Sequence, residues 1–333
     1  NIELIPCIQT LAHLNAIFKW QEQYDKINDC DDILLIDDER TYTLIDNMLS
    51  SISQCFTSKR IHIGMDEAYR VGLGKYLSKN GYKDRFDVIN SHLHKVCEIA
   101  DKYGFEPMIW SDMFCKLALE TTDYYKEADL EQIRKKADLP QNVSLVYWDY
   151  YSKDKKRYEN MIKTNKAFQR PVVFAGGAWT WRGFAPDNKF SIETSFPAIT
   201  ACKENEIRDI FITVWGDDGA ECSKASVFPS LMYAAEIAKG NNDVDKIKEK
   251  FKEITGAEFD SFMLLDKLDT PGGKHYDNPS KYLLYNDPFT GIKDYLCKEG
   301  DNLYYENLAK KLNKVSGKGE FSYIFNALEK LCS

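Results

Sequence analysis

The chain has 333 residues, of which 44% are hydrophobic and 29% are charged, so it can bury a sizeable core and is not a disordered protein. This length suits one large barrel or two ordinary domains. The formal net charge of -8 argues against nucleic acid or an anionic membrane surface as the main partner, and no apolar run is long enough to span a bilayer.

The nine cysteines are odd in number and scattered, and no C-x-x-C pair occurs. This pattern predicts neither a disulfide framework nor a zinc site. We expect most of these cysteines to be reduced core residues, which favours a cytosolic location for the protein. The cysteines are Cys7, Cys30, Cys55, Cys97, Cys115, Cys202, Cys222, Cys297 and Cys332.

The chain opens directly on a strand-like run, so we expect it to be a piece of a longer protein.

Short apolar runs alternate with helical periodicities over the first two thirds of the chain. This alternation is typical of a parallel sheet covered by helices, whereas the chain after about residue 228 reads as helical only. The acidic stretch 31–38 reads as a variable connection. We expect strands at residues 2–10, 61–63, 105–110, 143–151, 172–179 and 209–218, and helices at 40–56, 86–103, 128–137, 158–165, 195–205, 231–238 and 244–254.

Four of the six expected strands end at or near a tryptophan: Trp110, Trp148, Trp179 and Trp215. In a barrel, the C-terminal ends of all strands line the active site, whereas an open doubly wound sheet gathers its site at one switch point. We therefore predict an α/β fold, a (β/α)8 TIM barrel that is N-terminally incomplete and lacks its first two strands. Residues 1–238 would form the barrel, with strands three to eight, and residues 239–333 a helical C-terminal extension.

Two adjacent carboxylates, Asp66 and Glu67, follow the strand at 61–63. Neighbours on a regular strand point to opposite faces, so both can face one pocket only if the backbone leaves strand geometry, which Gly64 permits. Paired carboxylates in one pocket suit acid/base chemistry, because burial and like charge separate their pKa values. The alternative is an acidic helix N-terminus.

The histidines indicate no metal centre. His92 and His94 lie two apart on an expected helix and face different directions, and no H-E-x-x-H occurs. His13 follows the first expected strand, in a loop where a histidine is more often a local hydrogen-bonding residue than a catalyst. We predict no metal and no cofactor.

The set of motifs resembles glycoside hydrolase family 20, the β-N-acetylhexosaminidases, from residue 1 to about residue 235. The motif sequences are most similar to those of the intracellular bacterial exo-hexosaminidases. In that subgroup a methionine, here Met65, replaces the second glycine before the Asp-Glu pair. The motifs are residues 8–13 (IQTLAH), 62–67 (HIGMDE), 109–112 (IWSD), 146–151 (VYWDYY), 175–179 (AGGAW) and 215–217 (WGD).

The resemblance implies a bacterial, cytoplasmic exo-hydrolase that removes terminal β-linked N-acetylhexosamine from a glycan. The family mechanism is retaining and substrate-assisted: the 2-acetamido carbonyl attacks the anomeric carbon to form an oxazolinium intermediate. Asp66 would orient the acetamide, and Glu67 would act as general acid and then as general base.

The resemblance also implies the substrate-binding residues. The aromatic side chains would wall the sugar, Tyr150 would donate to the acetamide oxygen in preference to Tyr147, and Asp217 would bind the sugar hydroxyls. His13 would belong to the hydrogen-bond shell behind Glu67. The substrate-binding set is His13, Trp110, Trp148, Tyr150, Trp179, Trp215 and Asp217.

Three alternatives stay open. The arginine that the family places on its first strand and the aspartate on its second are not in this sequence, so a non-catalytic sugar-binding remnant is one alternative. A barrel glycosidase with a carboxylate nucleophile, such as Asp112, Asp149 or Asp217, is another. A metal-dependent hydrolase built on His62, His13 and Asp66 is a third. The preference for GlcNAc or GalNAc, the linkage and the oligomeric state are open as well.

Overall fold

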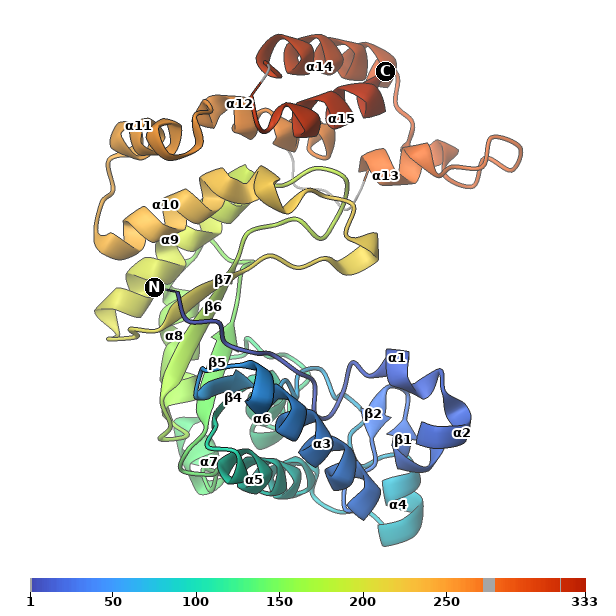
Figure 1. Cartoon of the computed structure of the whole chain (residues 1–333), viewed down its shortest axis with the longest axis vertical. Coiled ribbons are helices and arrows are strands. Elements are labelled where there is room, and N and C mark those ends of the chain that lie inside the picture. Colours follow the sequence, from blue (N-terminus) through green and yellow to red (C-terminus); the bar gives the residue numbers. More distant parts are fainter. Residues whose placement is uncertain (1, 272–278, 318) are drawn as a thin grey trace. The chain divides into compact units, whose positions relative to one another are not determined.

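The computed structural model describes residues 2–271, 279–317 and 319–333 (Figure 1). Two compact units make up the chain. The first unit contains Asn1–Trp148, Lys156–Phe174 and Ile207–Asp209, and the second contains Asp149–Lys155, Ala175–Glu206 and Ile210–Ser333.

A five-stranded sheet with the order β3-β4-β5-β6-β7 runs through the fold, and helices connect its successive strands. The neighbours β3 and β4, and β4 and β5, are parallel. Successive strands that lie side by side and are joined by helices are the pattern of a (β/α)8 barrel, so the predicted incomplete barrel is confirmed. The strands are β3 (Arg60–His62), β4 (Glu106–Trp110), β5 (Ser144–Trp148), β6 (Val172–Gly177) and β7 (Ile210–Thr213).

The first expected strand, at residues 2–10, is much shorter than predicted. Only an isolated parallel bridge joins Cys7 to His62. The backbone N–H of Ile8 donates to His62 O, and that of His62 donates to Pro6 O, both at 2.9 Å. The segment therefore follows the edge of β3 for one bridge and then turns away.

Aspartates start the main helices of the first unit. Asp38 accepts a hydrogen bond from the backbone N–H of Arg40 at the start of α3, and Asp84 accepts from those of Phe86 and Asp87 at the start of α5. A carboxylate at this position satisfies N–H groups that have no partner within the helix. The helices are α1 (Asn15–Phe18), α2 (Gln21–Tyr24), η1 (Asp25–Ile27), α3 (Glu39–Cys55), α4 (Lys75–Asn80), α5 (Arg85–Lys102), α6 (Asp112–Ala118), α7 (Leu130–Lys135) and α8 (Lys155–Lys166).

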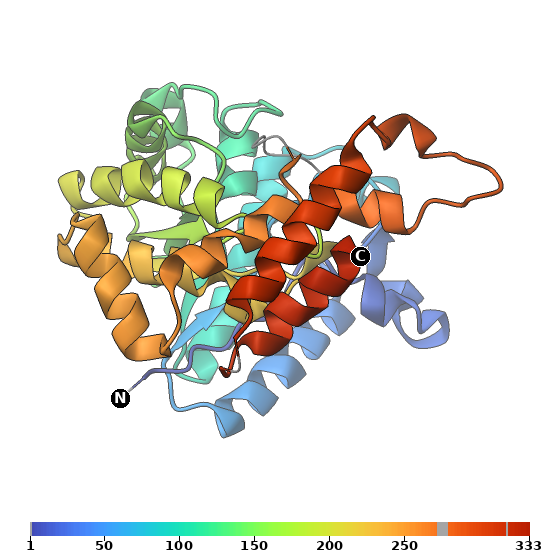
Figure 2. The same ribbon diagram turned by 90° about the horizontal axis from the view of Figure 1, so that it is seen from above.

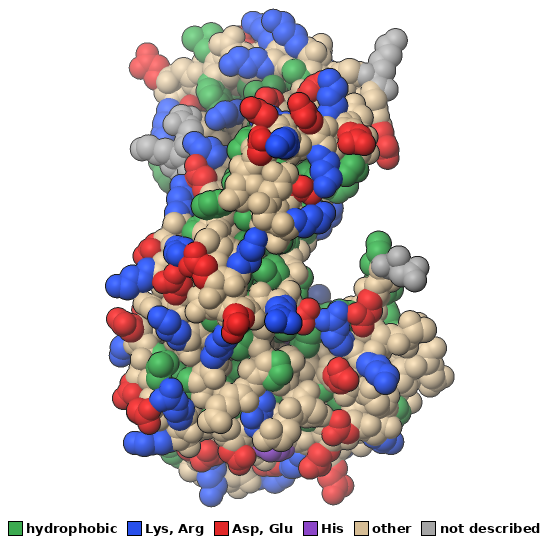
Figure 3. Space-filling view, turned by 90° about the vertical axis from the view of Figure 1, so that its left-hand side faces the viewer, with side chains coloured by type: hydrophobic (Ala, Val, Ile, Leu, Met, Phe, Trp, Pro, Cys, Tyr) green, Lys and Arg blue, Asp and Glu red, His purple; other side chains and the backbone are tan. Residues whose placement is uncertain are grey.

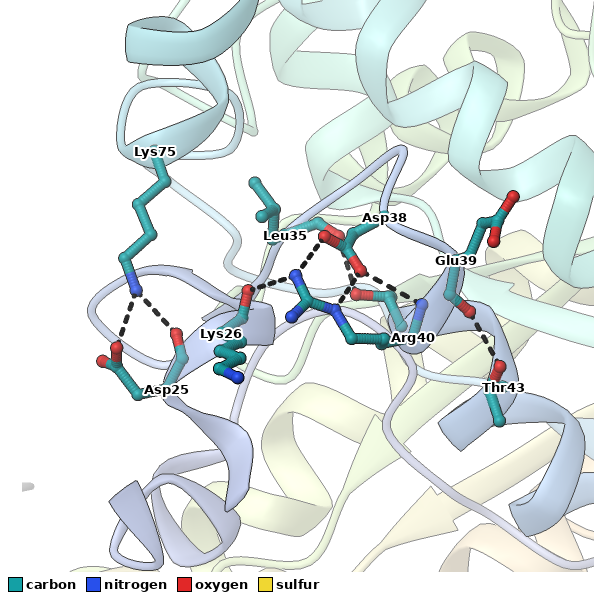
Figure 4. A network of polar contacts seen from close by, with 9 residues as sticks. Asp25, Lys26, Leu35, Asp38, Glu39, Arg40, Thr43 and Lys75 are labelled. Atoms are coloured by element: carbon teal, nitrogen blue, oxygen red, sulfur yellow. Dashed lines mark hydrogen bonds and ion pairs between the residues drawn. The ribbon is translucent and has the colours of Figure 1, made fainter. Parts of the chain in front are cut away.

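The acidic stretch 31–38, expected to be a variable connection, is partly ordered by a small antiparallel hairpin, β1 (Asn28–Cys30) and β2 (Ile33–Leu34). Figure 4 shows the hydrogen bonds that stabilise this region. Arg40 donates to Asp38 at 2.8 Å and to Lys26 O, and Lys75 donates to Asp25 O at 2.6 Å. The hairpin is too short to show strand periodicity in the sequence.

In the second unit, α9 (Asn188–Glu204) begins seven residues before the predicted start at 195. Its N-terminus is capped twice: Asp187 accepts from Phe190 N, while Asp266 accepts from Asn188 N and Lys189 N. Proline is favoured in the first turn of a helix and costly in the interior, so a start at 195 would have placed Pro197 in the favoured position. Here Pro197 lies inside the helix, whose beginning depends on an aspartate far along the chain.

Several of the helices after β7 share one apolar core, in which Phe251, Phe262, Leu265 and Leu312 are fully buried. Figures 1 and 2 both show α14 and α15 lying side by side. The remaining elements are η2 (Asp217–Gly219), η3 (Lys224–Val227), α10 (Phe228–Lys239), α11 (Val244–Thr255), α12 (Phe259–Met263), η4 (Leu265–Leu268), α13 (Pro279–Leu284), η6 (Asp294–Leu296), α14 (Asp301–Val315) and α15 (Ser322–Cys332).

The face of the molecule that Figure 3 presents is of mixed charge, with acidic and basic side chains interspersed over it. Within the described part of the chain, none of the helices combines the length and the apolar character that crossing a membrane requires.

Candidate active site

The backbone leaves strand geometry between β3 and the two carboxylates, as predicted. Gly64, Met65 and Glu67 have φ values of 74°, 76° and 51°. Left-handed backbone at two residues other than glycine costs free energy, and such strain persists only where the surroundings hold it, often at functional sites. It allows Asp66 and Glu67 to approach the same neighbour, although they are adjacent in sequence.

Gln9 holds this strained segment. Its Oε1 accepts from Met65 N at 3.3 Å, and its Nε2 donates to Asp66 Oδ1 at 3.0 Å. A Cβ at Gly64 would lie 1.9 Å from Gln9 Oε1, so only glycine fits beside this side chain. Gln9 lies in the motif at residues 8–13, and nothing in the local sequence indicates this role.

His13 lies between the two carboxylates. Its Nε2 is 3.3 Å from Asp66 Oδ2 and 3.6 Å from Glu67 Oε2, and its Nδ1 is 3.9 Å from Asp32 Oδ2. The hydrogen bond to Asp66 raises the pKa of His13 to about 9, against the opposing effect of burial. His13 is therefore an imidazolium at neutral pH, and its ring nitrogen lies closer to Asp66 than to Glu67, behind which it was expected.

The two carboxylates have different surroundings. Asp66 has 18% of its side chain exposed, and Glu67 has 38%. Burial raises the pKa of Asp66, but hydrogen bonds from His13 and Gln9 outweigh burial and hold that pKa below its usual value. Asp66 is thus kept ionised, while the more exposed Glu67 accepts one hydrogen bond from Tyr69 Oη, at 2.8 Å. Different environments are what give two carboxyl groups different chemical roles.

Asp112 lies directly beneath the pair. It is fully buried, and its Oδ2 accepts from the backbone N–H of Glu67 at 3.2 Å. Burial, followed by the nearby charge of Asp66, raises the pKa of Asp112 to about 7. A buried carboxyl that is bonded to the backbone is badly placed to attack a sugar, which weakens the alternative of Asp112 as nucleophile.

Trp110 and Trp148 occupy the C-terminal ends of the neighbouring strands β4 and β5. Trp110 is 4% exposed and packs on His62, with ring centroids 4.3 Å apart. Trp148 is half-buried and hydrogen-bonds to Asp112. Both positions are those predicted from the strand ends.

His62 has a structural position. Burial lowers the pKa of His62 to about 4, and its Nδ1 accepts from Gly64 N at 3.1 Å. Among the described residues, no group of three or more His, Cys, Asp or Glu side chains could hold a metal ion. A metal-dependent hydrolase built on His62, His13 and Asp66 therefore has no support in the geometry.

The second unit brings together Tyr150, Trp179 and Trp215. Trp215 Nε1 donates to the Tyr150 hydroxyl and Trp179 Nε1 donates to Tyr150 O, both at 3.1 Å. A Cβ at Gly177 would lie 2.7 Å from the Tyr150 ring, so this glycine allows the tyrosine to approach β6 closely. Trp179 is 2% exposed and lies behind Tyr150, whereas Trp215 is half-buried.

The remaining candidates, Asp217, Asp149 and Tyr147, differ in exposure and in their contacts. Asp217 is exposed in the short turn η2 after β7. Asp149 is almost fully buried and accepts from Tyr151 N at 3.0 Å, so it shapes the chain around Tyr150. Tyr147 is fully buried in the core, and Tyr150 is 7% exposed.

The comparisons with known proteins agree with this geometry. Residues 1–204 match the family described as glycosyl hydrolase family 20, catalytic domain, and residues 260–333 match the glycoside hydrolase 20C C-terminal domain. No curated protein is similar enough in sequence to count as a match.

Several solved structures are similar in fold. A chitobiase from Flavobacterium johnsoniae is 12% identical in sequence, with a TM-score of 0.51. The superposition covers 99% of this chain and 58% of the chitobiase chain. An exo-β-N-acetylglucosaminidase from Vibrio harveyi, solved with N-acetylglucosamine, has 14% identity over 80% of this chain and 43% of its own, with a TM-score of 0.50. A β-N-acetylhexosaminidase from Bacteroides fragilis has 19% identity over 71% of this chain and 48% of its own, with a TM-score of 0.49.

This chain therefore spans about half the length of the solved proteins that it resembles. At these identities the similarity concerns the fold, whereas the match of the catalytic domain covers more than half of the chain. The chain belongs to glycoside hydrolase family 20.

Proposed function

We propose that this chain supplies the catalytic carboxylates of an exo-acting hydrolase that removes terminal β-linked N-acetylhexosamine from glycans. The observation that supports it most is the pair Asp66 and Glu67 around one imidazolium, His13. One carboxylate is held ionised by its neighbours, and the other is more exposed and has only one hydrogen-bond donor within 3 Å among the described residues.

In the proposed first step, the carbonyl oxygen of the substrate's acetamide attacks the anomeric carbon and the glycosidic bond breaks. Glu67 gives its proton to the departing oxygen, and the ionised Asp66 accepts a hydrogen bond from the acetamide N–H, which becomes more acidic as the oxazolinium ring forms. In the second step, the Glu67 carboxylate removes a proton from the water that attacks the anomeric carbon, and the ring opens with retention of configuration.

The aromatic candidates would bind the sugar. Trp110, Trp148 and Trp215 would wall the sugar, and of these Trp148 and Trp215 are half-buried while Trp110 is 4% exposed. The Tyr150 hydroxyl, which accepts from Trp215, would donate to the acetamide oxygen in the complex. Trp179 would support Tyr150 from behind. Asp217, exposed after β7, would bind hydroxyls of the terminal sugar and so restrict the enzyme to chain ends.

The proposed function extends to the substrate class, the cellular location and the domain bounds. The substrate would be a glycan or glycoconjugate that ends in GlcNAc or GalNAc, and the Vibrio relative that was solved with N-acetylglucosamine supports the former. We propose a cytoplasmic location, no cofactor, and no nucleic-acid or membrane partner. The barrel would extend to residue 238 and the helical region from 239 to 333.

A thiazoline analogue of the cyclised sugar tests the mechanism. A site built around internal attack is complementary to the bicyclic intermediate, so the thiazoline should inhibit hydrolysis competitively and on the order of 10²-fold or more tightly than N-acetylglucosamine. The measurement is the ratio of the two inhibition constants on the full-length natural polypeptide. Equal constants would rule out the oxazolinium route, and absence of hydrolysis would favour a sugar-binding remnant.

A further inference from the structure

Tyr69 is folded back onto the carboxyl group of Glu67. The backbone N–H of Tyr69 donates to Glu67 O at 2.6 Å, which closes a tight turn around Ala68, and Glu67 itself has a φ of 51°. This turn places the Tyr69 hydroxyl 2.8 Å from Glu67 Oε1. The contact therefore depends on the same left-handed backbone that presents the catalytic pair.

Two helices hold Tyr69 in this place, although 51% of it is exposed. From the start of α5, Arg85 donates to Tyr69 O at 2.5 Å and to Val71 O at 3.1 Å. From α6, the Lys116 ammonium lies 4.5 Å from the centre of the tyrosine ring, on its face. An exposed side chain with backbone and ring both fixed loses little entropy when it makes its hydrogen bond, which suits a functional contact.

We propose that Tyr69 is a positioning residue for Glu67, which it holds by one oxygen so that the carboxyl group keeps a fixed orientation during proton transfer. This inference rests on the proposed function of Glu67 as acid and base. The Tyr69 hydroxyl donates to Glu67 Oε1, whereas Glu67 Oε2 lies 3.6 Å from His13 Nε2, so each carboxylate oxygen has a different neighbour.

The two chemical steps make opposite demands on this hydrogen bond. In the first step, a proton passes from Glu67 to the leaving oxygen as the glycosidic bond breaks, and negative charge grows on a carboxylate to which Tyr69 donates. In the second step, the carboxylate takes a proton from water, so the charge that Tyr69 stabilises disappears. The donor therefore accelerates the first step and slows the second.

The substitution Tyr69→Phe removes the hydroxyl and keeps the ring under Lys116. With an alkyl N-acetylglucosaminide, whose departure needs the acid, kcat/KM should fall about 10-fold or more, since hydrogen bonds to charged groups are among the stronger ones. With a dinitrophenyl glycoside, whose leaving group needs no proton, kcat/KM should change less than about threefold. Tyr323→Phe, at a tyrosine of similar exposure in α15, is the control and should leave both substrates unaffected.

The outcomes separate this inference from the proposal on which it rests. If the natural enzyme hydrolyses the alkyl glycoside and Glu67→Gln does not, but Tyr69→Phe behaves like the natural enzyme, then Tyr69 has no positioning role. Equal losses on both substrates would also overturn the inference, because they would show general damage to the site. If the natural enzyme or Glu67→Gln contradicts the acid role, the proposed function fails first.

Discussion

At the scale of single residues, the pair Asp66 and Glu67 is distinguished by its neighbours and not by its own chemistry. Gln9 and His13 keep Asp66 ionised, whereas Glu67 accepts from Tyr69 and from no other side chain of the described residues within 3 Å. A group that must carry a proton in one step and accept one in the next has to exchange protons readily, which suits the more exposed of the two.

Replacing Glu67 by Gln should remove acid catalysis. Hydrolysis of alkyl glycosides should fall by about 10²–10⁴-fold, whereas the first step with activated aryl glycosides should be affected much less. Steady-state kcat/KM for both substrate types measures the difference. A similar loss on both would count against Glu67 as the acid.

His92 lends itself to a test of pH dependence. It is fully buried in α5, its Nε2 donates to Thr10 O at 2.9 Å, and its Nδ1 accepts from the Tyr42 hydroxyl. Burial lowers the pKa of His92 from 6.5 to about 4. The unfolded chain therefore binds a proton at a higher pH than the folded one, so the stability that this residue contributes is present above pH 6.5 and is lost as the pH falls towards 4.

The substitution His92→Gln keeps an amide donor for Thr10 and cannot titrate. Between pH 6.5 and pH 4, the free energy of unfolding of the natural protein should fall relative to this variant by up to about 3 kcal/mol. Denaturant titrations of both proteins at each pH measure this difference. Asp112 and Asp266 have raised pKa values and act in the opposite direction, but they are present in both proteins and cancel. Parallel pH profiles would contradict the assignment.

At the scale of elements, the turn after β3 depends on glycine. Gly64 has a φ of 74°, and a Cβ there would overlap Gln9, the residue that donates to Asp66. Gly256, just after α11, has a φ of 69° and a ψ of 5°, in the left-handed region, with nothing within 4 Å of its would-be Cβ. Both positions have a positive φ, but only Gly64 is crowded by a neighbouring side chain.

The substitution Gly64→Ala should therefore lower the free energy of unfolding by at least about 2 kcal/mol more than the control Gly256→Ala, which carries the cost of left-handed backbone alone, about 1 kcal/mol. Gly64→Ala should also reduce hydrolysis, because Gln9 must move away from Asp66. Denaturant midpoints and kcat on both variants measure these effects. Equal effects would mean that the crowding against Gln9 is relieved without cost.

At the scale of the whole molecule, the C-terminal helices contribute a core of their own within the second unit. The Phe262 ring lies edge-on to the rings of Phe251, Phe321 and Phe325, at centroid distances of 5.4 to 5.5 Å. Phe262 is fully buried, whereas Phe289 is 97% exposed. This contrast provides a matched pair of phenylalanines in one region.

The substitution Phe262→Ala should cost about 3–5 kcal/mol of stability, because it removes buried surface and leaves a cavity among aromatic rings. Phe289→Ala should change stability by less than about 0.5 kcal/mol. Thermal or denaturant unfolding of each variant supplies the comparison. A small effect of Phe262→Ala would show that the helices repack around the gap.

Local sequence pattern predicts the alternation of strand and helix, the helices α3, α5 and α7 to within two residues, and the strand ends that carry Trp110, Trp148 and the Asp66-Glu67 pair. It missed the short helices α1, α2, α4 and α6. Periodicity and caps act over a few residues, so a sequence displays them directly. The folded chain alone shows that α9 begins at the cap from Asp266 and that His13 is an imidazolium between two carboxylates. It also shows that Gln9 and Tyr69 hold those carboxylates, while Asp112 holds the backbone of Glu67. Apart from Tyr69, these contacts join residues that are 45 or more positions apart. Their energies depend on distance and burial, which only the folded chain defines.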